Sequence, residues 1–92
     1  MDTQAIEEKL IELPDWNYES KCLCKEYQFK TYLDSIDFVQ KVGLKAETID
    51  HHPRIIIDYK KIRIELITHS AGDVTSVDFK LAKMIESLYH QI

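Results

Sequence analysis

Apolar residues recur every three or four positions in three stretches of the chain, residues 2–13, 31–50 and 75–92. This spacing predicts three amphipathic helices, each with one side to bury. The first begins at Asp2 or Thr3, and Pro14 ends its pattern. Gly43 interrupts the second helix at a cost of about 1 kcal/mol relative to alanine, so we expect it to allow close packing against a sheet. The apolar positions are Ile6, Leu10 and Leu13 in the first helix, Leu33, Ile36, Val39, Gly43 and Ala46 with Phe38, Val42 and Ile49 beside them in the second, and Val77, Leu81, Ile85, Leu88 and Ile92 in the third.

Alternating apolar and polar residues predict a first pair of β-strands between the first two helices. One strand surrounds Trp16 and the chain turns near residues 19–21. The next strand places Leu23, Tyr27 and Phe29 on one face, because alternate residues of a strand share a face. These features predict an antiparallel pair.

A second pair of strands, residues 54–59 and 62–69, is rich in isoleucine. Lys60-Lys61 lies between them and predicts a two-residue hairpin connection. Residues 70–74 follow as a loop in which Gly72 is available for a positive φ.

The predicted order is helix, strand, strand, helix, strand, strand, helix. We therefore expect one α+β domain, residues 1–92, in which a four-stranded, mainly antiparallel sheet carries the three helices on one face. The other sheet face or an edge strand is then open to subunit contacts. Because Ile56 and Ile67 lie outside the alternation of the isoleucines at 55, 57, 62 and 64, we expect part of the hairpin's apolar surface to meet another subunit, in a homodimer or homotetramer.

Composition and charge exclude several classes of protein. The chain of 92 residues is 45% hydrophobic and has two glycines and two prolines, which is typical of a folded domain. Its net charge is −4 and its lysines are scattered, so direct nucleic-acid binding is not expected. The longest uninterrupted apolar run is Ile55-Ile56-Ile57, far too short to span a bilayer, and the N-terminus lacks the apolar core of a secretory signal. We therefore expect a cytoplasmic protein without a membrane span.

Cys22 and Cys24 are the only cysteines. With two histidines they could in principle complete a zinc site. Two small, half-buried thiols in a reducing compartment are the favoured interpretation, because free cysteine often fills space in a core. No metal site is therefore expected from the cysteines.

Residues 47–78 hold three of the four histidines, His51, His52 and His69. Histidine can give or take a proton near neutral pH, and a neighbouring carboxylate can fix its tautomer, so this concentration suggests proton-transfer chemistry. Pro53 biases His52 toward extended backbone, which turns it away from His51. The nearby carboxylates are Glu47, Asp50 and Asp78.

Each of these residues also has a purely structural interpretation. His51 and His52 follow a predicted helix, whose C-terminus favours a cation. Thr75 and Asp78 have the spacing of a capping box at the start of the third helix. Glu47 and Asp50 can be solvated helix charges, and His69 a half-exposed polar residue.

The combined spacing is more specific than any single member. It is Glu-x3-His-His-Pro-x5-Tyr-x9-His-x8-Asp, and it resembles the signature of the pterin-4a-carbinolamine dehydratases. The similarity extends over nearly the whole chain. The other stretches that resemble the family are Leu13-Pro14-Asp15-Trp16, Tyr27-x-Phe29, residues 42–47, Arg63-x-Glu65-Leu66-x-Thr68-His69 and Asp78-Phe79-x-Leu81-Ala82.

The resemblance implies a compact α+β fold that forms dimers or tetramers and dehydrates 4a-hydroxytetrahydropterin to quinonoid dihydropterin. This activity recycles the pterin used by aromatic amino acid hydroxylases, and the family needs no metal or prosthetic group. By position, the residues that line the pterin site are Glu47, Asp50, His51, His52, His69 and Asp78. The chain departs from many relatives in having Ile55 in place of an aromatic residue and Val77 in place of an arginine.

The chemistry suggests how these residues divide the work. We expect His51 and His69 to act as general acids on opposite faces of the pterin, and His52 to hold the ring or to take the proton from the ring nitrogen. Glu47 or Asp50 can accept hydrogen bonds from the amino-pyrimidine edge or orient a histidine. Asp78 can orient His69 besides capping its helix.

Two other functions stay open. In animals, members of the family also bind and stabilise dimers of a homeodomain transcription factor, which would leave the histidines idle. The three histidines could also be ligands of a metal with an open position. The proline behind His52 makes common ligation awkward, because it splays the adjacent side chains apart.

Overall fold

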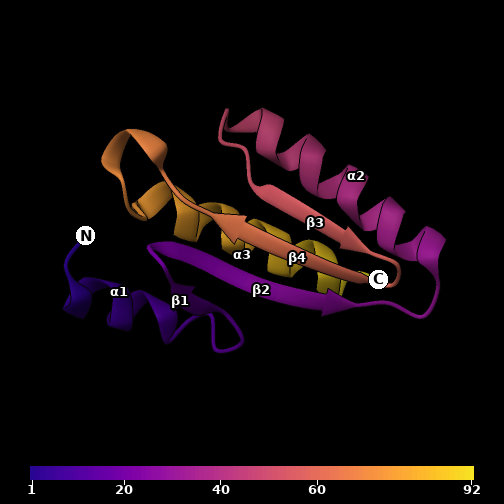
Figure 1. Ribbon diagram of the computed structural model, residues 1–92, viewed down its shortest axis with the longest axis horizontal. Helices are drawn as coiled ribbons and strands as arrows, with labels where there is room; N and C mark the ends of the chain where they lie inside the picture. Colours follow the sequence, from indigo (N-terminus) through magenta and orange to yellow (C-terminus); the bar gives the residue numbers. More distant parts are fainter.

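The elements follow one another in the order that the hydrophobic pattern predicts, and they build the expected α+β fold (Figure 1). The computed structural model describes residues 1–92. Its elements are α1 (Thr3–Leu10), β1 (Asn17–Glu19), β2 (Cys22–Gln28), α2 (Tyr32–Thr48), β3 (Arg54–Asp58), β4 (Lys61–Leu66), the 3₁₀ turn η1 (His69–Ala71) and α3 (Ser76–His90). No helix is both long enough and apolar enough to cross a membrane.

The four strands form one antiparallel sheet in the order β1-β2-β4-β3, so β1 and β3 are its edges. The turn between β1 and β2 lies where the sequence predicts it. Ser20 and Lys21 form this turn, and both have a positive φ, 51° and 64°. Paired positive φ values match the twist of the flanking strands in a tight hairpin.

The second hairpin turns one residue earlier than predicted. Asp58 pairs with Lys61 in the sheet, which leaves Tyr59 and Lys60 as the connection. This register places opposite charges side by side at the end of the hairpin, a pairing that stabilises a sheet. The strand β4 is also shorter than predicted, because His69 begins η1 instead of ending the strand.

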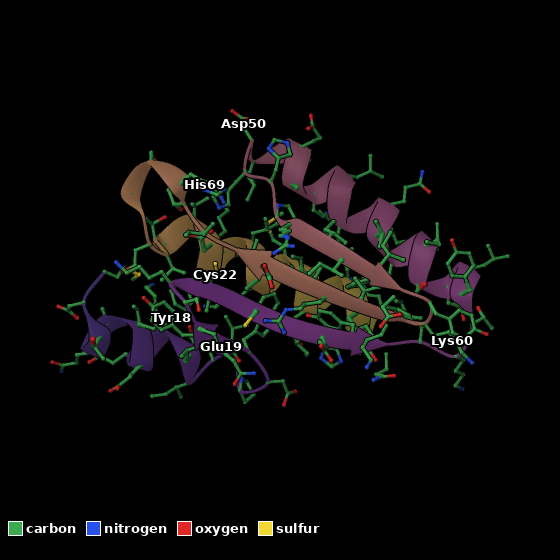
Figure 2. The ribbon with its side chains drawn as sticks, in the orientation of Figure 1. Tyr18, Glu19, Cys22, Asp50, Lys60 and His69 are labelled. Atoms are coloured by element: carbon green, nitrogen blue, oxygen red, sulfur yellow. The ribbon has the colours of Figure 1, made fainter.

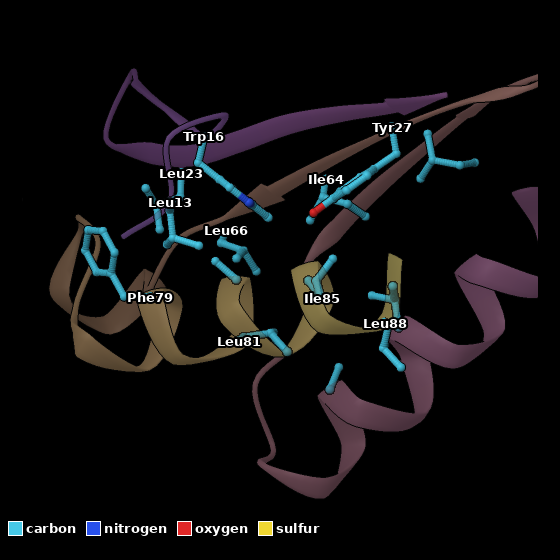
Figure 3. Packing of buried hydrophobic residues seen from close by; sticks show 14 of the residues in the cluster. Leu13, Trp16, Leu23, Tyr27, Ile64, Leu66, Phe79, Leu81, Ile85 and Leu88 are labelled. Atoms are coloured by element: carbon cyan, nitrogen blue, oxygen red, sulfur yellow. The ribbon is translucent and has the colours of Figure 1, made fainter. Parts of the chain in front are cut away.

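One face of the sheet and the inner sides of the helices enclose a single hydrophobic core (Figure 3). The register sets Leu23 opposite Leu66 and Tyr27 opposite Ile62, so all four side chains share the buried face. Each helix covers this face with buried apolar residues: Ile6 from α1, Phe38, Val42 and Ala46 from α2, and Phe79, Leu81, Ala82, Ile85 and Leu88 from α3.

The buried side of α2 differs from the predicted stripe. Leu33 was expected to be buried and is 73% exposed, whereas Ser35 is fully buried. The two possible stripes are neighbours on the helix, and the sheet takes the one that carries the bulky Phe38. A Cβ on Gly43 would meet nothing within 4 Å, so the expectation that Gly43 permits close packing is wrong.

The two faces of the sheet differ in chemistry. Pairing of Ile55 with Ile64 and of Ile57 with Ile62 puts all four isoleucines on the helix side of the sheet. The outer face is charged instead. Its ion pairs join Arg63 to Glu19, Glu26 and Glu65, and Arg54 to Glu65. Ile56 pairs with Arg63 and so lies on this outer face, outside the alternation of the other hairpin isoleucines.

Glu86 of α3 ties this helix to β2. Trp16 Nε1 and the Tyr27 hydroxyl donate to Glu86 Oε1 over 3.0 and 2.5 Å, and Lys25 Nζ forms an ion pair with the same oxygen. Burial alone would raise the pKa of Glu86, but the hydrogen bonds from Lys25, Tyr27 and Trp16 outweigh it and the pKa lies below its ordinary value. The ionised carboxylate is thus the form that the fold favours.

Candidate active site

The candidate site begins where α2 ends. The helix is closed by its backbone: His51 N–H donates to the Ala46 carbonyl over 3.2 Å, and Asp50 N–H to the Glu47 carbonyl over 3.3 Å. Asp50 has a φ of 49°, in the left-handed region. This pattern is a Schellman motif with a left-handed residue after the helix. Because the backbone supplies these caps, the imidazole of His51 is free to bind elsewhere.

The His51 ring lies against the first turn of α3. Its Nε2 is 2.5 Å from Asp78 Oδ1. The His51 side chain is 15% exposed and the Asp78 side chain is fully buried. A buried carboxylate beside an imidazole fixes the orientation of the ring and stabilises a positive charge on it.

Asp78 is held by two further donors. Thr68 Oγ1 donates to Asp78 Oδ2 over 2.7 Å, and Thr75 N–H donates to the same oxygen over 2.9 Å. The bond from Thr75, the N-cap residue of α3, confirms the capping interpretation of Asp78. Asp78 was expected to orient His69, but its other oxygen, Oδ1, contacts His51 instead.

Thr68 is a site residue that the sequence pattern does not single out. It was seen only as part of the last strand. Its hydroxyl contacts Asp78, and it directly precedes His69 in the chain. A threonine next to a candidate histidine was the available signal, but nothing in the sequence shows which way its side chain points.

His52 behaves differently from its neighbour. Its Nε2 is 2.6 Å from Glu47 Oε1, and the two side chains are 54% and 75% exposed. An ion pair this exposed contributes little to stability, so either group can turn to another partner at small cost. The two adjacent histidines therefore have separate carboxylates, one buried and one at the surface.

His69 begins η1, and its side chain is exposed. Figure 2 shows His69 and Asp50 at the same end of the molecule, far from Lys60 in the hairpin turn. The loop that carries His69 closes on Gly72, whose φ is 65° as its predicted role requires. Tyr18 of β1 fastens this loop by donating its hydroxyl to Asp73 Oδ1 over 2.7 Å.

The hydrogen bond between Tyr18 and Asp73 shifts the pKa of both side chains. The hydrogen bond to Asp73 raises the pKa of Tyr18, and the same bond lowers the pKa of Asp73. The tyrosine therefore stays a donor and the aspartate an acceptor. Together they hold the loop between β4 and α3 in one place.

Metal ligation finds no support in the geometry. Nowhere do three or more His, Cys, Asp or Glu side chains gather as a metal ion would need. His51 and His52 instead contact different carboxylates. The two cysteines belong to β2, on the outer face of the sheet, and burial raises the pKa of both Cys22 and Cys24.

This arrangement defines a class: a small α+β domain that carries, at one end of its sheet, an imidazole backed by a buried carboxylate, with two exposed histidines on nearby segments. The profile of the family described as pterin 4 alpha carbinolamine dehydratase matches residues 1–88. The chain belongs to this family.

Relatives agree in sequence and in structure. The chain is 40% identical over 88 residues to a protein of Sulfolobus acidocaldarius named "Putative pterin-4-alpha-carbinolamine dehydratase", covering 96% of this chain and 97% of that one. It is 42% identical over 85 residues to a protein of the same name from Acidobacterium capsulatum, covering 92% of each. A crystal structure described as a transcriptional coactivator/pterin dehydratase from Brucella melitensis superposes with a TM-score of 0.92 at 27% identity, over 96% of each chain.

A more distant structure shares the fold alone. It is described as a pterin dehydratase-like protein that is a RuBisCO assembly factor in the alpha-carboxysome. Its TM-score is 0.66 at 18% identity, over 79% of this chain and 84% of that one. The fold therefore occurs in proteins described with different roles, and the site must decide between them.

Proposed function

We propose that the protein is a hydro-lyase, a 4a-hydroxytetrahydrobiopterin dehydratase, that converts 4a-hydroxytetrahydropterin to quinonoid dihydropterin and water. The observation that carries this proposal is the pair formed by His51 and the fully buried Asp78. Membership of the dehydratase family supports the substrate class. The reaction needs proton donors and acceptors and no nucleophile, which agrees with a site built from imidazoles and carboxylates.

His51 suits the role of general acid. The reaction protonates the hydroxyl on C4a so that it leaves as water, and it removes a proton from the adjacent ring nitrogen, so that a carbon–nitrogen double bond forms. Asp78 stabilises the charged imidazole that supplies the first proton. The arrangement is the same one by which a buried aspartate supports the histidine of a catalytic triad.

The remaining residues take the roles that their exposure allows. His69, on its own loop, is the second general acid, facing the other side of the pterin. His52 and Glu47 are exposed and weakly held, so they can exchange their mutual bond for bonds to the pterin ring. Asp50, whose side chain is also exposed, can accept from the amino-pyrimidine edge.

The direct test is a rate measurement on the purified protein with a chelator present. Chemically generated 4a-hydroxytetrahydropterin decays slowly alone, and the protein should speed its decay. His51→Ala and His52→Ala should each lower the rate about 10²-fold or more, as expected for positioned acid–base groups. His90→Ala is a matched control, because His90 is an exposed histidine that contacts Glu86 outside the site. Full activity in the His51 and His52 variants would refute the catalytic roles.

The biological setting follows from the reaction. A dehydratase of this kind recycles pterin for aromatic amino acid hydroxylases, and such a hydroxylase is the expected pathway partner. The proposal predicts that adding the protein to a pterin-dependent hydroxylase assay restores the flux limited by accumulating 4a-hydroxytetrahydropterin. Equal flux with wild-type protein and with His51→Ala would contradict it.

A second candidate function is a non-enzymatic module of the coactivator type, which binds or dimerises other proteins. It is favoured by the description of the Brucella melitensis structure as a transcriptional coactivator/pterin dehydratase. It is also favoured by Leu33 and Leu44 on α2, which are 73% and 62% exposed. Such a role would tolerate His51→Ala and would be lost in Leu33→Glu, so the two variants separate the alternatives.

We also propose that the chain forms a homodimer or homotetramer. The support is the unpaired edge of β3 and the exposed Ile57, Leu33 and Leu44. Light scattering in the micromolar range should give a mass at least twice the 10.8 kDa of one chain. A mass of one chain throughout that range would refute the assembly.

A further inference from the structure

Thr68 occupies a fixed place between β4 and the His69 loop. Its N–H donates to the Asp73 carbonyl over 3.1 Å, and its own carbonyl accepts from Ala71 N–H and Gly72 N–H, each over 3.0 Å. Three backbone hydrogen bonds therefore hold this residue. Its side chain has little freedom to leave the position from which it reaches Asp78.

The hydroxyl of Thr68 has contacts on both sides. It lies 2.7 Å from Asp78 Oδ2 and 2.8 Å from Thr75 Oγ1. A hydroxyl has one hydrogen to donate and can accept in addition. Because Asp78 as a carboxylate only accepts, Thr68 donates to Asp78, and the Thr75 hydroxyl donates to Thr68. In this series of hydrogen bonds, each hydroxyl hydrogen thus points toward the Asp78 carboxylate.

The two oxygens of Asp78 are consequently not equivalent. Oδ2 accepts from Thr68 O–H and Thr75 N–H, while Oδ1 faces only the Nε2 of His51. Two donors on Oδ2 prevent the carboxylate from rotating about its side chain. With Oδ1 held in place as an acceptor, the His51 ring nitrogen in contact with it must carry a hydrogen.

We infer that Thr68 is a positioning residue, which locks Asp78 so that His51 keeps its hydrogen on Nε2 and presents Nδ1 to the substrate. This inference deepens the proposed dehydratase function and rests on it. In the charged form, Nδ1–H donates its proton to the C4a hydroxyl, the C–O bond breaks and water leaves. The electron pair of the adjacent ring nitrogen forms the carbon–nitrogen double bond, and the proton on that nitrogen passes to the neutral imidazole of His52. His51 is left neutral with Nε2–H still on Asp78, and Nδ1 takes a new proton from solvent for the next turnover.

Thr68→Val tests the inference, because valine has nearly the same shape and no hydroxyl. With one donor lost from Oδ2, the carboxylate can rotate and the neutral His51 ring can adopt either tautomer. We expect kcat to fall about 10-fold with KM nearly unchanged, since Thr68 does not touch the substrate. Thr68→Ser, which restores the hydroxyl, should restore kcat.

A matched control is Thr48→Val. Thr48 also uses its hydroxyl locally, donating to the Lys45 carbonyl over 2.6 Å, but it is exposed and makes no contact with Asp78. This variant should keep the wild-type kcat. A loss in both valine variants would show that removing any threonine hydroxyl near the site lowers the rate, and would overturn the specific role of Thr68.

The tautomer itself can be read without any activity. Nitrogen-15 chemical shifts of the histidines distinguish a protonated from an unprotonated ring nitrogen, and neutral His51 in the wild-type protein should show hydrogen on Nε2 alone. Thr68→Val should show a mixture of the two tautomers. Hydrogen on Nδ1 in the wild-type protein, or an unchanged tautomer with unchanged kcat in Thr68→Val, would overturn the inference. If the wild-type protein does not dehydrate the pterin, the proposed function fails, while the nitrogen shifts still decide whether Thr68 sets the tautomer.

Discussion

Asp78→Asn separates the two roles that the structure gives to this carboxylate, as a helix cap and as the partner of His51. Asparagine is nearly the same size and keeps one oxygen. That oxygen can replace Oδ2 and accept from Thr68 O–H and Thr75 N–H. The amide NH₂ then occupies the place of Oδ1 and points a hydrogen at Nε2 of His51. All three hydrogen bonds survive only if His51 moves its own hydrogen to Nδ1.

The expected cost in stability is small and the expected cost in activity is large. Asparagine is about as good a cap as aspartate, and the lost interaction of the charge with the helix dipole is worth about 0.3–1 kcal/mol. Asp78→Ala would leave the donors of Thr68 and Thr75 unpaired, at about 1–3 kcal/mol each when buried. In Asp78→Asn the neutral His51 ring would be held in the wrong tautomer, and no carboxylate would stabilise its charged form. We therefore expect turnover to fall by about 10²-fold or more.

The assay is the rate of loss of 4a-hydroxytetrahydropterin, measured beside a urea or thermal unfolding curve for each variant. Asp34→Asn is the matched control for the cap. Asp34 lies in the first turn of α2, three residues after the N-cap Thr31, just as Asp78 follows Thr75, but Asp34 is exposed. Full turnover in Asp78→Asn would show that Asp78 is only a cap. A stability loss equal to that of Asp78→Ala would show that its hydrogen bonds are not those described.

Three further predictions concern the rest of the fold. Gly43→Ala should raise the free energy of unfolding by about 0.5–1 kcal/mol in a urea titration, because the added methyl meets nothing within 4 Å and glycine weakens a helix; a loss of stability would contradict the open position. The pKa of Glu86 is lowered in the folded state, so its contribution to stability is present above its unfolded pKa and is lost as pH falls through the folded pKa. Glu86→Gln should therefore flatten the acid side of the plot of unfolding free energy against pH. Parallel plots for the variant and the wild type would refute this. Asp50→Asn should keep the left-handed turn and the melting temperature, since asparagine tolerates a positive φ, and should raise KM if the Asp50 carboxylate binds the pterin edge; an unchanged KM would make Asp50 a turn residue only.

The order of elements and the signature were predictable because both depend on spacing along the chain. Periods of two and of three to four residues identify strands and helices. The pattern from Glu47 to Asp78 resembles the signature of one family, and the similarity extends over nearly the whole chain. Orientation within an element was less predictable. In α2 two apolar stripes lie side by side, and only packing against the sheet selects Phe38 over Leu33 as the buried residue. In the hairpin, the register alone shows that Ile55 and Ile64 are partners on the helix side.

The contact between His51 and Asp78 was also hard to predict from the sequence, because it depends on how two helices meet. Asp78 was expected to orient His69, which is also much nearer to it in the sequence. In the fold, however, α2 ends at the end of the molecule where α3 begins (Figure 1). A helix C-terminus favours a positive charge and a helix N-terminus a negative one. His51 follows the first of these ends and Asp78 lies in the first turn of the other, so both helix dipoles favour an imidazolium facing a carboxylate. Two antiparallel helices thus supply, by their direction alone, the polarity that a general acid at this position requires.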